Sequence, residues 1–178
     1  EDPMICRYMQ ARANRFLPGN LLNSAVVVNR NQGDEGFGDT SILSRMLGAL
    51  SFNGDIASWS SKLTESVRGW VDIYKSIRIL LVQDFFQLLP LPTSIDDWDA
   101  LQFISYSRES FVIFVFAGQI GGTKTVFPKQ LDGNSIYRVT RTHIGYIGSF
   151  TGFEIMSDGL SVKLDAYEGG LWQATLEI

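Results

Sequence analysis

The segment Asn53-Gly54-Asp55-Ile56-Ala57-Ser58-Trp59, together with the run from Ser60 to Arg78, decides how this chain is organised. A strand end, a polar Gly-Asp turn and a long amphipathic helix make one βα unit. We expect Ser61 to cap the helix. Apolar residues at helical spacing predict one buried face, formed by Leu63, Val67, Trp70, Val71, Tyr74 and Ile77.

The residues before this segment repeat the same alternation. Met4 to Arg15 predicts a short helix, and the apolar run Ser24 to Val28 predicts a strand buried on both faces of a parallel sheet. Thr40 is expected to cap a helix that continues through Leu50, and Ala49 to Phe52 is expected to form a further short strand. This order is that of a βα repeat.

After Arg78 the pattern changes to short strands, and we expect no further helix. Short strands separated by turn signals predict an antiparallel sandwich of about 95 residues. A hairpin turn at Glu168-Gly169-Gly170 is expected to join the last two strands. The expected strands are Ile79–Leu89, Leu101–Tyr106, Ser110–Ala117, Ile136–Arg141, Phe153–Met156, Leu160–Tyr167 and Leu171–Ile178. The predicted fold class is therefore α+β, with domains at residues 1–80 and 81–178.

Composition excludes several classes of function. The net charge of −4 and the scattered Lys and Arg residues give no surface for nucleic acid. The longest apolar run, Phe111 to Ala117, is too short to span a bilayer. Cys6 and His143 are the single residues of their types, which excludes an internal disulfide, a zinc site of several cysteines and a His-rich metal site. We therefore expect no cofactor, nucleic acid or membrane partner, and composition assigns no compartment.

Two motifs outside the helical half invite a functional interpretation. Gly118 to Thr125 resembles a phosphate loop, but Thr123 precedes Lys124 where a glycine is needed, so a Gly-rich hairpin loop is favoured. Asp96 to Asp99 could hold calcium or a sugar; a solvated turn anchored by Trp98 is the favoured alternative. His143 is expected in an exposed strand or loop.

Polar residues follow the predicted parallel strands. Asn29, Asn53 and Asp55 lie where each strand ends, and that end of an α/β barrel carries the active site. For Asp55, a helix-capping role is the alternative. The loop after the first strand adds three acidic residues, Asp34, Glu35 and Asp39.

Several motifs, taken in order, carry a resemblance to a known family. They comprise a Gly-Asp turn with a helix ending in Tyr-Lys-x-x-Arg, two strand motifs, a Leu-Asp-Gly segment and a closing stretch rich in Gly. Here they are Gly54-Asp55-Ile56 with Tyr74 to Arg78, Trp98 to Gln102, Phe111 to Phe116, Leu131-Asp132-Gly133 with Tyr137, and Gly152, Met156, Gly159 and Leu160. From about Leu17 onward, the chain resembles the carboxyl-terminal part of melibiase-type α-galactosidases of glycoside hydrolase family 36.

The resemblance implies the last βα units of a (β/α)₈ barrel, followed by an antiparallel β-sandwich. It also implies retaining hydrolysis of terminal α-galactosides by two aspartates on earlier strands. The family's Lys-x-Asp nucleophile motif and its acid/base motif have no match here, so no catalytic residue is assigned. Because Glu1-Asp2-Pro3 lacks an initiator Met, we expect the chain to have been cut from a longer one.

We accordingly expect a fragment that is inactive alone. In the full-length parent, Asn29, Asn53 and Asp55 would contact an α-galactoside-like carbohydrate. The open edge of a barrel remnant would also be available for self-association. A further alternative is a catalytically dead scaffold whose half-barrel is covered by a partner or by self-association. The alternative is a non-catalytic carbohydrate-binding or interaction sandwich that presents Trp98, Tyr106 or Trp172.

Overall fold

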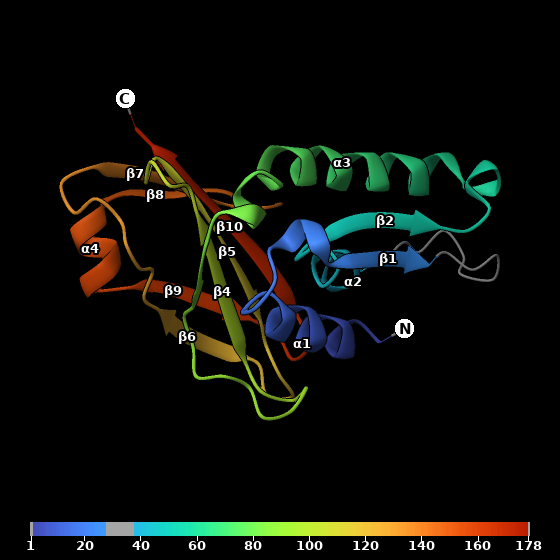
Figure 1. Cartoon of the computed structure of the whole chain (residues 1–178), viewed down its shortest axis with the longest axis horizontal. Helices are drawn as coiled ribbons and strands as arrows, with labels where there is room; N and C mark the ends of the chain where they lie inside the picture. The colour runs from blue at the N-terminus through green and yellow to red at the C-terminus, as the bar shows by residue number, and fades with distance from the viewer. Residues whose placement is uncertain (1, 28–37, 178) are drawn as a thin grey trace. The chain divides into compact units, whose positions relative to one another are not determined.

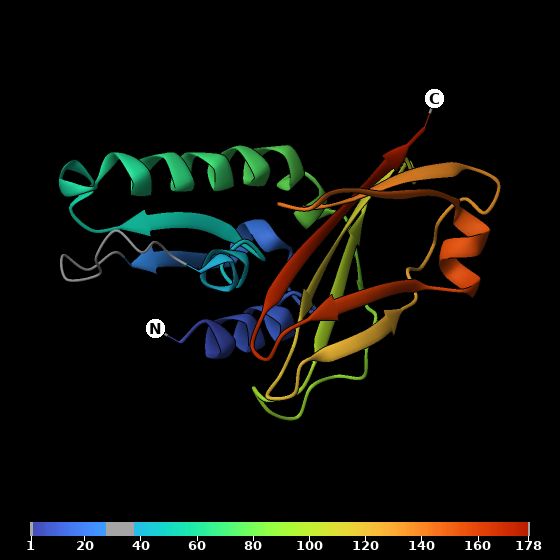
Figure 2. The ribbon, with the colours of Figure 1, turned by 180° about the vertical axis from the view of Figure 1, so that it is seen from behind.

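A computed structural model describes residues 2–27 and 38–177. The chain divides into two compact units, Glu1–Val82 and Gln83–Ile178, each of which is described by itself. The fold is α+β, with mostly antiparallel strand pairing (Figures 1 and 2). Within the described ranges, no helix is both long enough and apolar enough to cross a membrane.

The first unit alternates helices with two parallel strands. Residues on β1 and β2 pair in register, with Val26 opposite Phe52, so the predicted parallel pair is confirmed. Short 3₁₀ turns lie between the longer elements. The elements are α1 (Pro3–Ala13), η1 (Gly19–Leu21), β1 (Asn23–Val27), α2 (Asp39–Leu43), β2 (Ala49–Asn53), η2 (Ile56–Ser58), α3 (Ser61–Ile77) and η3 (Leu80–Val82).

Both long helices begin at side-chain caps. The Asp2 carboxylate accepts a hydrogen bond of 2.7 Å from the Met4 N–H at the start of α1. At α3 the cap is Ser60, whose hydroxyl accepts a hydrogen bond of 3.2 Å from the Leu63 N–H. The predicted cap, Ser61, is wrong by one residue because Ser60 has the extended backbone that a cap requires.

The helix predicted from Thr40 to Leu50 ends at Leu43. The Ser44 hydroxyl donates to the Ser41 carbonyl (2.9 Å), and the Met46 N–H is shared between two carbonyls. Side-chain competition of this kind weakens a helix. Gly48 then passes so close to the Leu22 carbonyl that a Cβ atom would lie 2.3 Å from its oxygen, and β2 begins directly afterwards.

β1 is buried on one face instead of two. Ser24 and Val26 are buried, whereas Asn23 and Val27 are exposed and Ala25 is half-buried. The thiol of Cys6 on α1 lies 3.3 Å from the Ser24 hydroxyl, so this helix contributes to covering the buried face. The prediction of a doubly buried strand is wrong because the described helices cover the face that carries Ser24.

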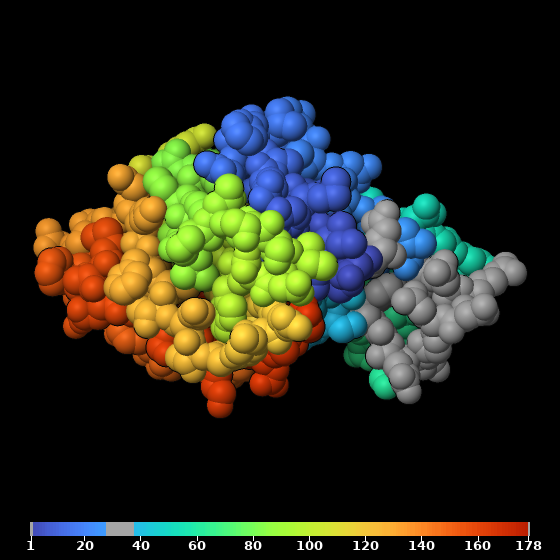
Figure 3. Space-filling model, turned by 90° about the horizontal axis from the view of Figure 1, so that it is seen from below, coloured from blue at the N-terminus to red at the C-terminus, as the bar shows by residue number. Residues whose placement is uncertain are grey.

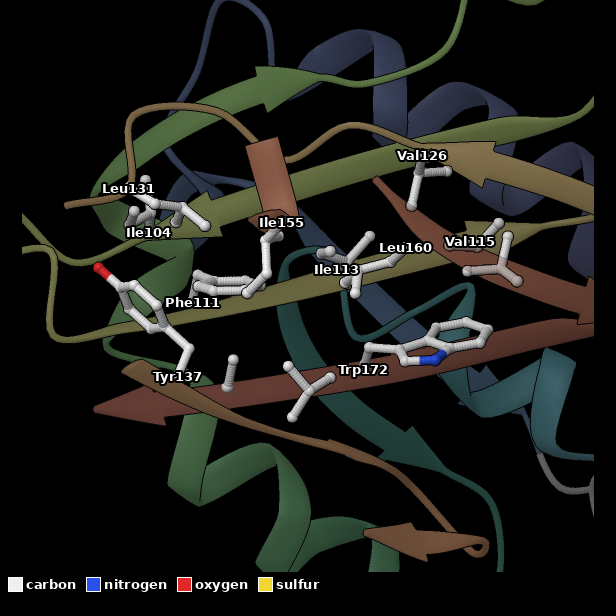
Figure 4. Close-up of a cluster of buried hydrophobic side chains, with 14 of the residues drawn as sticks. Ile104, Phe111, Ile113, Val115, Val126, Leu131, Tyr137, Ile155, Leu160 and Trp172 are labelled. Carbon is white, nitrogen blue, oxygen red and sulfur yellow. The ribbon is translucent and has the colours of Figure 1, made fainter. Parts of the chain in front are cut away.

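The second unit contains a six-stranded sheet of order β3-β4-β5-β10-β7-β8 and a separate β6-β9 pair. All of its pairs are antiparallel, as predicted. Side chains from both sheets and from α4 meet in one core (Figure 4). The elements are β3 (Asp84–Gln87), β4 (Asp99–Ile104), β5 (Ser110–Phe116), β6 (Gly122–Val126), β7 (Ile136–Arg141), β8 (Gly145–Thr151), α4 (Gly152–Ser157), β9 (Leu160–Leu164) and β10 (Gly169–Leu176).

α4 replaces the strand predicted at Phe153–Met156, and the expectation of no helix after Arg78 is wrong. A capping box explains the helix. The Thr151 hydroxyl accepts from the Glu154 N–H (3.2 Å), and the Glu154 carboxylate accepts from the Thr151 N–H (2.8 Å). Two reciprocal bonds at the first turn outweigh the strand preference of the apolar residues.

Pairing of the last strands also differs from the prediction. β9 pairs with β6, whereas β10 lies between β5 and β7, so Glu168-Gly169-Gly170 does not close a hairpin. The Gly118–Thr125 stretch leads from β5 into β6, which belongs to the other sheet, so a hairpin there is also wrong. Lys124 is exposed within β6, and a strand, not the helix of a phosphate loop, surrounds it.

Replacing Thr151 with alanine is expected to lower the free energy of unfolding by about 1 kcal/mol, because the cap of α4 is lost.

Hydrogen bonds from the Thr151 N–H and then from its hydroxyl lower the pKa of Glu154. A lowered pKa in the folded state means that this stabilisation is present above the unfolded pKa and is lost as pH falls through the folded pKa. Thermal unfolding of Glu154→Gln and the parent chain should therefore differ at pH 7 and converge in acid.

Candidate functional site: the carboxyl edge of β1 and β2

β1 and β2 end at the same edge, because Val27 lies opposite Asn53 in the parallel register. Of the predicted sugar-contacting residues, Asn53 and Asp55 lie at this edge and are exposed. Asn29 lies outside the described residues, as do Asp34 and Glu35. The structure thus brings two of the three predicted residues to one edge.

The turn after β2 presents the Asp55 side chain outward. Gly54 has φ 141°, a conformation that residues with a Cβ rarely adopt, and it reverses the chain after Asn53. The Ser58 N–H and hydroxyl donate to the main-chain oxygen of Asp55 (3.0 and 2.8 Å). The Asp55 carboxylate makes no capping hydrogen bond to η2, and Ser60 caps α3. The helix-capping alternative for Asp55 is therefore wrong.

An aromatic pair holds this turn against α3. The Phe52 and Trp59 rings meet edge to face, with centroids 6.1 Å apart and planes at 74°. Both rings pack on Leu63 and Val67 from the apolar face of α3. Residues 54–58 are thereby anchored at both ends, which limits the positions that Asp55 can reach.

A polar pair lies on the face of the strands opposite Ser24, and the sequence interpretation did not identify it. The Ser51 hydroxyl donates to the Asn23 side-chain oxygen (3.2 Å) across the two strands. Ser51 and Asn53 alternate along β2, so they point to the same face. Asn23 and Ala25 alternate with Ser24 and Val26 along β1, which could have indicated a polar face. Only the parallel register shows which residues of β2 lie on that face.

These groups can bind hydroxyl groups but do not make a catalytic pair. Amide, hydroxyl and carboxylate side chains donate or accept hydrogen bonds with sugar hydroxyls. Retaining glycoside hydrolysis needs two carboxyl groups about 5 Å apart, one as nucleophile and one as acid/base. Among the described residues, no group of three or more His, Cys, Asp or Glu side chains is placed to hold a metal ion.

The acidic turn of the second unit is structural. Asp97 accepts from the Thr93 and Ser94 N–H groups (2.8 and 3.0 Å), and Asp96 accepts from the Tyr167 hydroxyl (3.0 Å). The Trp98 indole donates to the Ile120 carbonyl (2.7 Å). The Asp96 and Asp97 carboxylates thus hold separate loops, which confirms a turn anchored by Trp98. The prediction is wrong for Asp99, which is buried in β4 and accepts a hydrogen bond of 2.6 Å from the Gln87 amide.

The other aromatic candidates differ in accessibility. Trp172 is only 3% exposed and lies beneath the Arg141 guanidinium, 4.9 Å from its ring centroid, so it cannot present a sugar platform. Tyr106 is 68% exposed. His143 is exposed in a turn with φ 64°, as predicted.

No protein-family model matches the chain, and no curated protein matches it. Solved structures do share its fold. The galactosidase domain of the α-galactosidase-sucrose kinase AgaSK aligns with a TM-score of 0.78 at 18% identity, covering 99% of this chain and 25% of that one. The GH36 α-galactosidase AgaB from Geobacillus stearothermophilus aligns with a TM-score of 0.80 at 18% identity, covering 99% of this chain and 24% of that one.

The α-galactosidase from Lactobacillus brevis gives a TM-score of 0.81 at 16% identity, covering 99% of this chain and 25% of that one. Variants of the G. stearothermophilus enzyme AgaA with the same fold have been solved in complex with raffinose and with stachyose. The chain thus spans about a quarter of the length of these structures, and the likeness extends over nearly all of its own residues.

Proposed function

We propose that this chain is the carboxyl-terminal portion of an α-galactosidase-like glycoside hydrolase of the melibiase type. Residues 1–80 correspond to the last βα units of a (β/α)₈ barrel, and residues 81–178 to the β-sandwich that follows it. The observation that carries the proposal is the likeness to α-galactosidase structures over 99% of the chain. The parallel β1–β2 pair supports it, since barrel strands pair in this way.

In this proposal, Asn29, Asn53 and Asp55 contribute to the rim of a sugar site. The carboxyl ends of barrel strands carry the active site, and Asn53 ends β2 while Asp55 opens the following turn. The exposed carboxylate of Asp55 can accept hydrogen bonds from sugar hydroxyls. AgaA, which shares the fold, binds raffinose and stachyose, so α-galactosides are the proposed substrate class.

The two catalytic carboxylates belong to the remainder of the parent protein. The purified chain is therefore expected to leave nitrophenyl α-galactoside intact, because it lacks the nucleophile and acid/base pair. The assay is release of nitrophenol measured against buffer alone. Turnover above that background would contradict the proposal that the chemistry lies elsewhere.

The DNA immediately upstream tests the proposal directly. We expect a continuous reading frame that encodes earlier barrel strands with two aspartates, and a product that hydrolyses raffinose. A stop codon in that frame, or a continuous product that binds but does not cleave α-galactosides, would contradict it. Asp→Asn variants at the two aspartates are the control that separates true turnover from contamination.

A further inference from the structure

We propose that the outer edge of β1, the edge away from β2, is a strand-docking site. Its occupant is an extended polypeptide with apolar residues at alternate positions, which adds to β1 in the parallel direction and packs on α1. The inference rests on the proposed function only for the natural source of that strand, the part of the parent that precedes α1. It goes further in stating that the edge accepts such a strand in trans.

The hydrogen-bond pattern determines which backbone groups face outward. The Ala49 N–H donates to the Leu22 carbonyl (2.6 Å) where the two strands begin to pair. In a parallel ladder, alternate residues of one strand direct their backbone groups to the same neighbour. Ser24 and Val26 therefore face β2, while the N–H and C=O groups of Asn23, Ala25 and Val27 point away from it.

A groove of about 530 Å³ lies along this edge, between α1 and β1. Figure 1 places α1 on the side of β1 away from β2, and Figure 3 shows the side chains of α1, in dark blue, at the surface. Ile5 is 47% exposed and Met9 is 65% exposed, and both line the groove. The groove thus joins outward backbone groups to an apolar wall, the combination that β-strand addition uses.

Two of the outward carbonyls already accept hydrogen bonds from side chains of the same unit. Gln10 donates to the Asn23 carbonyl at 3.4 Å, and the buried Arg45 donates to the Ala25 carbonyl at 2.9 Å. Each carbonyl keeps a second lone pair, so it can also accept an N–H from an added strand. Polar side chains at an open edge are a common protection against indiscriminate pairing, and the 3.4 Å Gln10 contact is the weaker of the two.

The connectivity of the unit favours a parallel strand over other occupants. α2 connects β1 to β2 as the helix of a parallel crossover. α1 precedes β1 as α2 precedes β2. Because such crossovers are almost always right-handed, a strand preceding α1 belongs at the free edge of β1. The α-galactosidases that share this fold extend well beyond the matched quarter, which supplies the chain for such a strand.

The added strand must be apolar on one face. Its side chains on the α1 side would lie against Ile5 and Met9, while those on the other face would continue the face of Asn23 and Ser51. Successive side chains of a strand point to opposite faces. An alternating apolar and polar sequence therefore fits, and a uniformly charged one does not.

The test uses a fluorescein-labelled peptide of alternating valine and threonine, with a lysine at each end, titrated with the full chain and followed by fluorescence anisotropy. Ala25→Pro removes one outward N–H and leaves the β1–β2 ladder intact, because that N–H does not face β2. Ala25→Ser keeps the N–H and is its matched control. We expect Ala25→Pro to weaken binding about tenfold or more and Ala25→Ser to bind as the parent chain does.

The apolar wall has its own pair of variants. Met9→Lys is expected to weaken binding, whereas Leu21→Lys, 64% exposed and outside the groove, should not. Amide exchange at Ala25 and Val27 should slow when the peptide binds, and circular dichroism establishes that each variant is folded.

Equal binding by Ala25→Pro and the parent chain, or no binding by the parent chain, would overturn the proposal. Dimerisation of the chain, seen by light scattering and abolished by Ala25→Pro, would overturn it in favour of a second copy as the occupant. None of these measurements depends on glycosidase activity, so the outcome is separate from that of the proposed function.

Discussion

Replacing Trp172 with alanine is expected to lower the free energy of unfolding by about 3–5 kcal/mol, the largest stability effect that we expect in the second unit. Trp172 is only 3% exposed and packs in the core shared by the six-stranded sheet and the β6–β9 pair (Figure 4). Its removal leaves a cavity where two sheets meet, and the Arg141 guanidinium loses the ring on which it lies. Urea unfolding followed by circular dichroism measures the change.

Tyr106→Ala is the matched control, since Tyr106 is 68% exposed and a surface change of this kind shifts the free energy of unfolding by about 0.5 kcal/mol or less. Trp172→Phe retains most of the buried area and should fall between the two. If Trp172→Ala cost no more than the control, the described packing of the two sheets against each other would be wrong.

The parts of the fold that could be predicted are those with a local pattern. α3 repeats apolar residues at helical spacing over 17 residues, and only its cap was misplaced. β7 and β9 alternate buried and exposed positions, so they are recognisable as strands with one buried face. Their partners were not predictable in the same way, because pairing depends on contacts distant in the sequence.

The missed elements have weak or misleading local signals. β6, Gly122–Val126, is polar and exposed along most of its length, and β8 contains Gly145 and Gly148. In α4 the apolar residues suggested a strand, although Thr151 and Glu154 carry the spacing of a capping box. Gly169 and Gly170 resemble a hairpin turn, yet they begin β10, which pairs with β5 and β7.

The candidate site could be predicted only where the chain itself brings residues together. Asn53 and Asp55 are two residues apart, so one turn places both at the strand end. Asn23 and Ser51 are far apart in the sequence, and their contact follows from the register in which Ala25 lies opposite Ser51. That register was not evident from the apolar pattern, which predicted burial on both faces.

Under the proposed function, Asp55→Ala in the full-length parent is expected to lower kcat/KM for raffinose about 10- to 100-fold, which corresponds to about 1.4–2.7 kcal/mol of lost transition-state binding. The physical reason is the loss of a charged acceptor for a sugar hydroxyl at the carboxyl edge of β2. Asn53→Ala removes a neutral partner, so a smaller decrease is expected. Steady-state rates over a range of raffinose concentrations measure both.

Lys62→Ala is the matched control, because Lys62 is exposed at the start of α3, beyond the aromatic pair that anchors the turn. It should leave kcat/KM unchanged.

A rise in KM at constant kcat for Asp55→Ala would place its contact on a part of the sugar bound equally in the ground and transition states. An equal fall in kcat and kcat/KM would place the contact in the transition state alone. Unchanged constants for both Asp55→Ala and Asn53→Ala would remove this edge from the sugar site, even if the parent proves to be an α-galactosidase.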